Sequence, residues 1–429
     1  MTIVADLEQR LRDHLARVAG TPAPAQWEDR MSRRIPGSEG RHRYGWAPQV
    51  IAAAALVAIA AGVFVGLRAS RQNDAVKPKP TALATPSVSP TAGMPMIHTI
   101  HMFTPKAGWA LTEQGVLRTT DGWAHWVNVG PPGVSGLAGA SQFVSVTSAW
   151  VVTGNAASPR TSSIYHTTDG GASWAQSTVV DPAAAGPGNI DFVDATHGWL
   201  FVSYGAAAGS MGGAIFRTVD GGGHWTRIEQ TSGGVQEAPG SLPFGCDKAG
   251  VSFINTMTGW ASGNCAGGGT FFYVTHDAGR TWSLQSLPLP GGFDQGGGAT
   301  TSLPVFFSDR SGYFVASSSE TIFYTTADGG TNWVPHPLPV GNSWQPFGSI
   351  AFTSLGDGWL ISGDGALIYR TNDGGRHWTS FQASPQLTGL QVFDAIDATH
   401  AIAVLNPSGT QNALIETSDG GRKWKPIEP

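Results

Sequence analysis

Six carboxylates near the predicted connecting loops could perform acid–base chemistry. Glycoside hydrolysis needs two carboxyl groups flanking the scissile bond, one as the acid and the other as base or nucleophile. Each of the six falls in or beside a Gly-, Pro- and Ser-rich segment of the kind that forms surface loops. They are Asp181, Asp191, Glu237, Asp247, Asp294 and Glu320. Their separation in space does not follow from the sequence, so a glycoside hydrolase, sialidase-like or other, is kept as the alternative function.

The histidines and glycines give no comparable signal for a metal or a phosphate. His98 and His101 are spaced as a metal pair, but no third ligand lies nearby in the sequence, and zinc needs at least three. No GxxxxGK phosphate loop occurs, and the glycines at 296–298 fit a flexible loop better. We therefore predict no cofactor, no metal site and no catalytic residue.

One motif recurs seven times, and it must position any site that the chain contains. It reads Thr-x-Asp-x-Gly-x-x-Trp, with Trp123 in place of the Gly in the first copy. Its aspartates are 45 to 57 residues apart, which is the length of a four-stranded propeller blade. The motif residues are Asp121, Asp169, Asp220, Asp277, Asp328, Asp373 and Asp419, with Trp126, Trp174, Trp225, Trp282, Trp333, Trp378 and Trp424.

A second element precedes each motif and completes the repeat. It is an apolar strand, a polar turn, then Gly-Trp and another apolar strand. The element is clear in FVDATHGWLF around Trp199 and looser around Trp109, Trp150, Tyr313 and Ile402. Each unit therefore contains four strands. We predict an all-β fold, a seven-bladed β-propeller of four-stranded antiparallel blades over residues 96–429, preceded by a single transmembrane helix.

The motif resembles the Asp box, or BNR repeat, of sialidases, sortilin-type receptors and photosystem II assembly and stability factors. The resemblance covers roughly residues 96–429. With its Gly-Trp hairpins the chain is most similar to the photosystem II assembly factor-like group. The resemblance implies the fold but no single activity, because these families share the repeat and differ in function. An Asp in a tight turn can accept its backbone N–H bonds, and the Trp packs over the strands, so we interpret all seven boxes as structural.

The resemblance allows sialidase chemistry to be tested one residue at a time. Such a site needs three arginines that grip a carboxylate, a Tyr nucleophile with an acidic partner, and an Asp. Nearly all propeller arginines stand at repeat positions near the boxes, and only Arg160 belongs to a long loop of the opposite face. The Arg34-Ile35-Pro36 triplet, which resembles a sialidase motif, lies before the membrane segment. We therefore expect a binding protein and not an enzyme.

An apolar run separates the propeller from the N-terminal region. Residues 50–67 (VIAAAALVAIAAGVFVGL) are apolar throughout and long enough to cross a hydrocarbon core of roughly 30 Å. We divide this region into a cytoplasmic tail (1–47), a transmembrane helix (48–68) and a Pro/Thr/Ser-rich linker (69–95). The five arginines at positions 30–43 and the four basic residues at positions 68–79 hardly set its orientation. The linker favours a single-pass cell-membrane protein with the propeller outside.

The cytoplasmic tail contains one further periodic feature. Its apolar residues recur at spacings of three and four, which predicts a short amphipathic helix. They are Val4, Leu7, Leu11, Leu15 and Val18. This stripe could bind a cytoplasmic partner or lie on the membrane surface.

Charge and loop length indicate where the propeller binds its partner. Residues 93–429 contain 13 Lys/Arg against 23 Asp/Glu, so nucleic acid is excluded as a partner. The long connections at 154–163, 180–189, 203–213, 229–249, 286–302 and 335–349 nearly all fall on the face opposite the boxes. We predict that this face binds a protein or an envelope glycan, with Trp344 and Arg160 as contact residues.

The chain has two cysteines, Cys246 and Cys265. They flank a predicted hairpin whose turn centres near residues 256–257, so they stand almost opposite each other on neighbouring strands. Such positions are close enough for a bond, and an exported domain would oxidise them. We predict a disulfide, which on the chain-entropy model stabilises the fold by roughly 3 kcal/mol.

Overall fold

The computed structural model describes residues 96–122, 125–132, 134, 139–155, 160–233, 237–265, 268–289, 299–318, 320–339, 350–406 and 412–427. The chain divides into two compact units, Met1–Thr81 and Ala82–Pro429, and all of these residues lie in the second. The predicted tail, transmembrane helix and linker therefore lie outside the described residues, as does Trp344. Within the described part of the chain, no helix is long and apolar enough to cross a membrane.

Antiparallel β-sheets make up the second unit, as the alternating apolar pattern predicts. Five sheets have four strands each, and neighbours in the sheet are neighbours in the chain. The first three sheets contain β1 (Ile97–Thr104), β2 (Ala107–Thr112), β3 (Gly115–Thr119) and β4 (Val127–Asn128); β5 (Ala140–Phe143), β6 (Ala149–Asn155), β7 (Thr161–Thr167) and β8 (Ala175–Val180); and β9 (Gly186–Phe192), β10 (Gly198–Ala207), β11 (Ser210–Thr218) and β12 (Thr226–Thr231). The last two contain β22 (Ile350–Phe352), β23 (Gly358–Ile361), β24 (Leu367–Thr371) and β25 (Thr379–Gln382); and β26 (Leu390–Ala395), β27 (Ala401–Leu405), β28 (Ala413–Thr417) and β29 (Lys425–Pro426).

Between them lies a nine-stranded sheet, which differs from the predicted separate four-stranded units. It contains β13 (Asp247–Phe253), β14 (Gly259–Asn264), β15 (Phe272–Thr275), β16 (Ser283–Leu284), β17 (Thr300–Thr301), β18 (Val305–Phe306), β19 (Gly312–Ser317), β20 (Thr321–Thr326) and β21 (Val334–Pro337). The short strand β17 joins its two halves because Thr300 pairs with Asn264 on one side and with Ser317 on the other. A strand this short, in a Gly-rich connection, leaves no periodic signal in the sequence.

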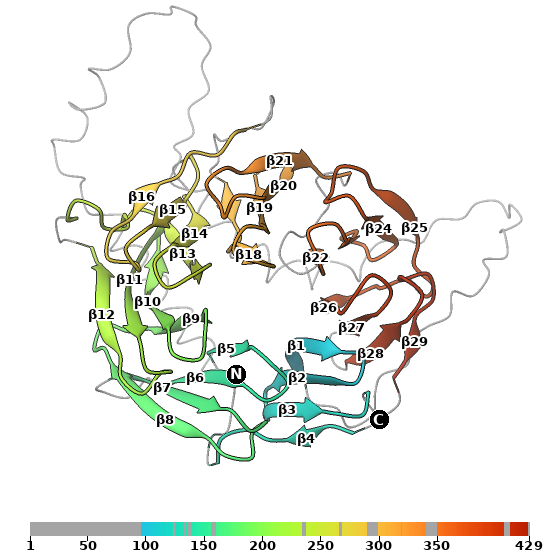
Figure 1. The fold of residues 1–429 in the computed structure, drawn as a ribbon, viewed down its shortest axis with the longest axis horizontal. Helices are drawn as coiled ribbons and strands as arrows, with labels where there is room; N and C mark the ends of the chain where they lie inside the picture. Colours follow the sequence, from blue (N-terminus) through green and yellow to red (C-terminus); the bar gives the residue numbers. More distant parts are fainter. Residues whose placement is uncertain are drawn as a thin grey trace, which may run out of the picture. The chain divides into compact units, whose positions relative to one another are not determined.

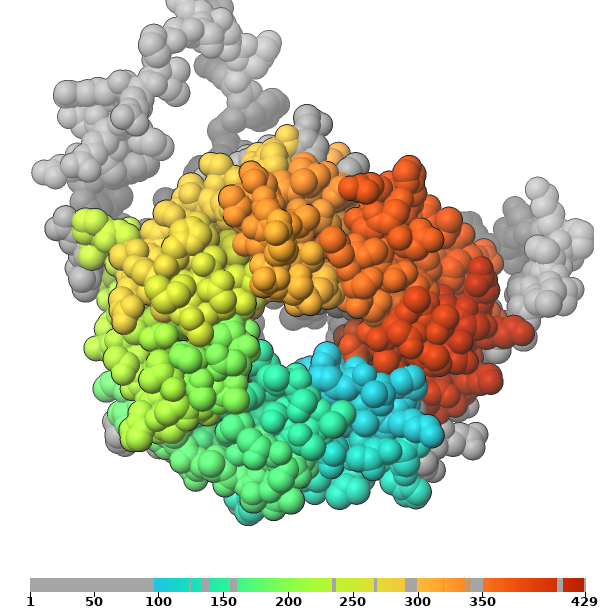
Figure 2. All heavy atoms as spheres, viewed as in Figure 1, coloured from blue at the N-terminus to red at the C-terminus, as the bar shows by residue number. Residues whose placement is uncertain are grey.

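The sheets stand side by side in a ring around a central opening (Figures 1 and 2). The strands β1, β5, β9, β13, β18, β22 and β26 are innermost (Figure 1). The ring closes between its first and last sheets, where the backbone N–H of Met102 in β1 donates to a carboxylate oxygen of Asp394 in β26 at 2.6 Å. The two sheets share no strand, so this bond and an apolar cluster that includes Ile100 and Ile402 hold the junction together.

The Trp of each Gly-Trp hairpin packs between successive sheets. Trp150 and Trp199 are almost fully buried, and their rings stack on Phe192 and Phe253 of the next sheet, with centroids 3.9 and 3.6 Å apart. The indole N–H of Trp199 also donates to the carbonyl of Ala278 in that next sheet. Apolar clusters therefore lie mainly between sheets, and each sheet needs its neighbours to bury its faces.

Every box turn repeats one set of hydrogen bonds. The Thr hydroxyl donates to one carboxylate oxygen of the box Asp at 2.8–3.1 Å, and the backbone N–H four residues after the Asp donates to the same oxygen. The residue after each Asp donates its N–H to the polar turn of the Gly-Trp hairpin in its own sheet. The box turns and these hairpin turns therefore share one face of the ring, which we call the box face.

The opposite face carries the connections between sheets and those between the second and third strands of each sheet. We call it the loop face. Its described connections include 181–185, 208–209, 232–233 and 237–246, together with the chain around Asn264 and Thr300. Strand β1 starts at the loop face and β29 ends there, so both ends of the propeller enter and leave on this side.

Candidate binding site on the loop face

Polar side chains of the inner strands fasten several of these strands to the next. Gln142 in β5 accepts the N–H of Phe192 at 2.6 Å, and Asp191 in β9 accepts the N–H of Phe253 at 2.7 Å. Asn189 bonds both the N–H and the carbonyl of Val251. The free edges of the inner strands are thereby satisfied, because a side chain replaces the missing partner strand. Asp191, a candidate for acid–base chemistry, thus lies in a structural contact.

Burial raises the pKa of Asp191 to about 7, although the Phe253 N–H bond lowers it. A carboxyl group whose pKa is higher in the folded state keeps its proton where the unfolded chain has lost it. The folded state is then favoured below the unfolded pKa near 4, and this contribution is lost as the pH rises toward 7.

We therefore expect Asp191→Asn to reduce the pH dependence of stability between about pH 4 and 7. Wild type should lose melting temperature across this window, by roughly 2–4 °C for each kcal/mol lost, while the variant stays flatter. Thermal unfolding at several pH values measures this. Parallel curves for the two proteins would contradict it, and Asp364→Asn on an exposed loop is the control.

At the loop-face end of the opening, a cavity of about 360 Å³ lies among the first three sheets. Its lining includes His98, Thr99 and Ser141, whose side chains make no hydrogen bond within the described part of the chain, together with Asn189. His98 is the one ionisable residue among the lining residues. The structure places His101 deeper in the ring, 3.8 Å from a carboxylate oxygen of Asp394. In the described residues no three His, Cys, Asp or Glu side chains gather as a metal site.

Arg160 and Asp181 meet where the second sheet leads into the third. The guanidinium of Arg160 donates to the carbonyl of Ala184, and its own carbonyl accepts the N–H of Asp181. The carboxylate of Asp181 is buried and accepts the hydroxyl of Tyr204 at 2.8 Å. Arg160 is exposed, and its guanidinium fastens this loop.

Tyr204, which sequence reasoning did not select, stands beside a carboxylate as a sialidase nucleophile would. Its environment opposes that role. Burial and the bond to Asp181 raise the pKa of Tyr204, so the phenolate is disfavoured. A nucleophilic Tyr needs the opposite shift.

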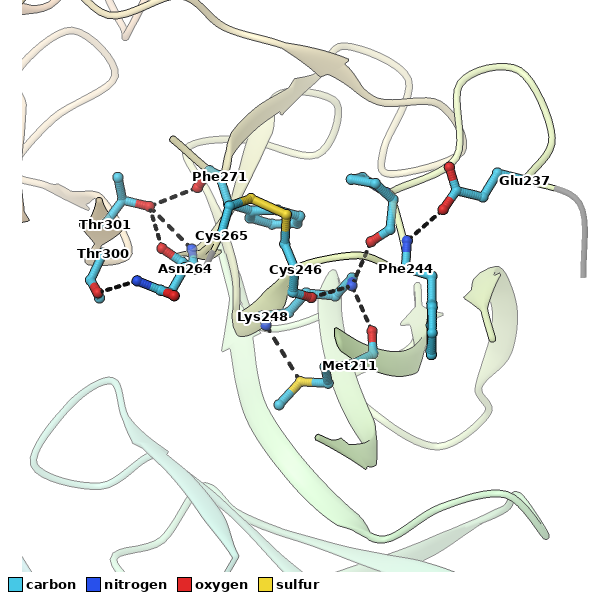
Figure 3. Close-up of a disulfide and its surroundings, with 12 residues drawn as sticks. Met211, Glu237, Phe244, Cys246, Lys248, Asn264, Cys265, Phe271, Thr300 and Thr301 are labelled. Atoms are coloured by element: carbon cyan, nitrogen blue, oxygen red, sulfur yellow. Dashed lines mark hydrogen bonds between the residues drawn. A yellow bond between two sulfur atoms is a disulfide. The ribbon is translucent and has the colours of Figure 1, made fainter. Parts of the chain in front are cut away.

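The disulfide predicted from the hairpin geometry is present. Cys246 and Cys265 are bonded, with their Cα atoms 4.5 Å apart, at the loop-face ends of β13 and β14 (Figure 3). The disulfide lies where the third sheet meets both halves of the nine-stranded sheet. On one side, Phe244 accepts the N–H of Met211, and on the other the side-chain amide of Asn264 donates to the hydroxyl of Thr300 at 2.8 Å.

Lys248 is the functional group that sequence reasoning missed at this junction. Only 5% of its surface is exposed, and its ammonium donates to the main-chain carbonyls of Met211, Pro243 and Cys246 at 2.7–3.0 Å (Figure 3). Burial lowers the pKa of Lys248 to about 8, although the nearby charges of Asp247 and two glutamates raise it. Its place two residues after Cys246 was the one signal in the sequence, and only the fold brings Met211 and Pro243 to it.

Two glutamates complete the junction. Glu229 is buried, and burial raises its pKa to about 7, while it accepts the N–H of Leu242. Glu237, a candidate acid, is exposed and accepts the N–H of Phe244 at 2.6 Å. Of the other candidates, Asp247 begins β13, Glu320 is exposed between β19 and β20, and Asp294 lies outside the described residues. The described candidate acids are thus dispersed over four places in the fold.

The box carboxylates are engaged in their own turns. In six boxes the second carboxylate oxygen bonds the side chain four residues later, for example Ser173 at 2.6 Å from Asp169. The Ser173 side chain and N–H lower the pKa of Asp169 to about 2. A second cavity, of about 390 Å³, lies on the box face between β20, β21 and the turn of Asp373.

Comparison with known proteins agrees with the box pattern. Residues 299–427 match the family model of the photosynthesis system II assembly factor YCF48. The chain therefore resembles photosystem II assembly factors over this stretch, and its repeat is that of an Asp-box propeller. The resemblance seen in the repeat is thereby confirmed.

Two curated proteins are similar to part of this chain. Over 120 residues it is 29% identical to the chloroplastic photosystem II stability/assembly factor HCF136 of rice (Oryza sativa subsp. japonica), covering 27% of each protein. Over 125 residues it is 30% identical to the photosystem II assembly lipoprotein Ycf48 of Synechococcus sp. (strain CC9902), covering 29% of this chain and 35% of that one. The chain thus spans about a third or less of the curated relatives that it matches.

Among solved structures, the GH74 xyloglucanase of Xanthomonas campestris is similar with a TM-score of 0.51 and 16% identity. The similarity covers 80% of this chain and 55% of that enzyme. At this identity the similarity shows the fold alone.

Proposed function

We propose that this protein is a non-enzymatic binding or assembly scaffold, tethered to the cell membrane, that holds a partner protein on the loop face of a seven-bladed propeller. The observation that carries the proposal is the concentration of long, individually braced loops on one face of a rigid ring. Counting the two halves of the nine-stranded sheet as separate blades gives one blade for each of the seven boxes. The names of the two curated relatives describe assembly factors, and one of them is a lipoprotein, which supports both the scaffold and the tether.

The tether is the predicted transmembrane helix at 48–68, which the linker at 69–95 connects to the propeller. We place the N-terminus in the cytoplasm and the propeller outside, where a disulfide can form.

The charges on the loop face indicate the chemistry of the partner. Glu113 and Glu320 are exposed there, and their side chains form no hydrogen bond or ion pair with any described residue. The cations on this face are engaged, since Lys248 is enclosed by carbonyls and Arg160 is bonded to Ala184. The face therefore presents unpaired negative charge, which suits a partner with basic residues.

Charge reversal on the loop face should weaken partner binding. We expect Glu113→Lys with Glu320→Lys to reduce recovery of the cross-linked partner by about 10-fold or more, measured with the tagged full-length chain in its own membranes. The matched control is Asp309→Lys with Glu416→Lys, two exposed acids at the box face, which should leave recovery unchanged. Trp344→Ala should also lower recovery without changing the melting temperature. Loss of recovery in the control alone would place the partner on the box face.

The glycoside hydrolase alternative predicts turnover, and we expect none. Within the described residues, the candidate acids lie apart from one another, near Tyr204, in the central opening, at the disulfide and between β19 and β20. The pKa of Tyr204 is also raised. Incubation of the protein with sialosides and β-glucans should release no more sugar than a blank. Hydrolysis that disappears in Asp181→Asn or Glu237→Gln would establish the enzyme instead.

A further inference from the structure

The segment from Gly240 to Cys246 connects the third sheet to the nine-stranded sheet. The Trp282 N–H donates to the carbonyl of Gly240, and the Leu242 N–H donates to Glu229. The Phe244 N–H donates to Glu237, and its carbonyl accepts the Met211 N–H at 3.2 Å. The Leu242 side chain is buried in an apolar cluster against which both cysteines pack. No strand of the described chain pairs with this segment, so its position depends on these hydrogen bonds, on Leu242 and on the covalent bond at Cys246.

Lys248 depends on the same segment. Two of the three carbonyls around its ammonium belong to Pro243 and Cys246, and the third belongs to Met211. No carboxylate oxygen lies within ion-pair distance of this ammonium among the described residues. If Pro243 or Cys246 moves, a buried charge loses its partners, and this costs free energy unless the whole segment opens to water. The disulfide and Lys248 therefore hold the segment as one cooperative unit.

The other cysteine stands at the end of an equally local support. Cys265 follows Asn264, whose backbone pairs with Thr300 and whose side chain bonds the Thr300 hydroxyl. Thr301 in turn bonds the carbonyls of Gly263 and Phe271. The hydrogen bonds of the other six box turns use none of these atoms, so the rest of the ring has support of its own.

We propose that the Cys246–Cys265 bond is a redox-controlled lock on the loop face. A dithiol reductant attacks one sulfur as its thiolate and forms a mixed disulfide, and its second thiol then releases the other cysteine. Two electrons and two protons pass to the protein as two thiols, and the reductant becomes an internal disulfide. Reduction frees residues 240–246, opens the carbonyl cage of Lys248 and changes the shape of the loop face while the ring stays folded. That this alters partner binding rests on the proposed function, whereas the opening itself does not.

Amide hydrogen exchange of the full-length chain tests the lock directly. After treatment with dithiothreitol, we expect the amides of Leu242, Phe244 and Lys248 to exchange about 10-fold faster or more, because the free energy of local opening is lower. The hydrogen-bonded amides of Gly374 and Gly420 in distant box turns should not change. Alkylation of both cysteines confirms reduction, and reoxidation should restore protection.

Two variants separate the lock from a simple staple. Lys248→Met keeps the disulfide but removes the ammonium, and it should speed exchange in the same segment, whereas Lys423→Met on a box turn should not. Cys246→Ser with Cys265→Ser should match the reduced wild type. Equal exchange in both redox states would overturn the proposal. So would loss of protection around the whole ring, or a bond that dithiothreitol cannot reduce in the folded protein. Because no partner is used, failure of the loop-face binding experiment would leave this result intact.

Discussion

Replacing Trp199 with Ala should lower the free energy of unfolding by about 3–5 kcal/mol, the usual cost of removing a buried Trp. The side chain has no exposed surface, and its ring stacks on Phe253 of the next sheet with centroids 3.6 Å apart. Its indole N–H donates to the carbonyl of Ala278 at 3.0 Å, and this bond is lost too. One substitution therefore opens a cavity between two sheets and leaves a carbonyl without its donor.

Chemical denaturation of the folded chain measures this effect, and Trp199→Phe is the matched variant. Phe keeps the stacking on Phe253 but lacks the indole N–H, so it should recover more than half of the loss. Leu284→Ala, at an exposed outer strand, should change stability by less than about 0.5 kcal/mol. If Trp199→Ala were as mild as Leu284→Ala, the packing between sheets would not be what stabilises the ring.

Arg370→Ala should destabilise the fold by about 2–4 kcal/mol, because it removes charge-assisted hydrogen bonds between two sheets. The guanidinium donates to the carbonyls of Ala398 and Gly420 in the following sheet at 2.8 and 3.2 Å, and to Gly358 in its own. It also stacks over Trp359, with the guanidinium carbon 3.6 Å from the ring centroid. Burial lowers the pKa of Arg370, which marks the desolvation that these contacts offset.

The same blade offers a control of the same residue type. Arg376 lies in the box turn that follows Arg370, is exposed, and donates no hydrogen bond to a described residue. Arg376→Ala should therefore leave the melting temperature within a degree or two, whereas Arg370→Ala should lower it by roughly 2–4 °C for each kcal/mol lost. Arg370→Lys should resemble Ala more than Arg, since an ammonium cannot reproduce the fork and the stacking. Equal effects at 370 and 376 would contradict the role assigned to the contacts between sheets.

Both predictions concern residues that the repeat pattern already places. Trp199 belongs to the Gly-Trp hairpin, and Arg370 precedes a box. The sequence predicts where such residues stand within a sheet because strand period and turn chemistry are local. It does not predict that Trp199 bonds Ala278, or that Arg370 reaches two carbonyls of another sheet, because these partners are set by how successive sheets twist and pack.

The sequence by itself determined the strands, the seven box turns, the two faces and the pairing of Cys246 with Cys265, because each follows from spacings within one repeat. Only the tertiary structure decided that Asp191 fastens one inner strand to the next, that Arg160 holds its own loop, and that three carbonyls enclose Lys248. It also decided that β17 joins two units into one sheet. These contacts join residues of different repeats or different loops. Their geometry depends on the closure of the ring, which no single repeat encodes.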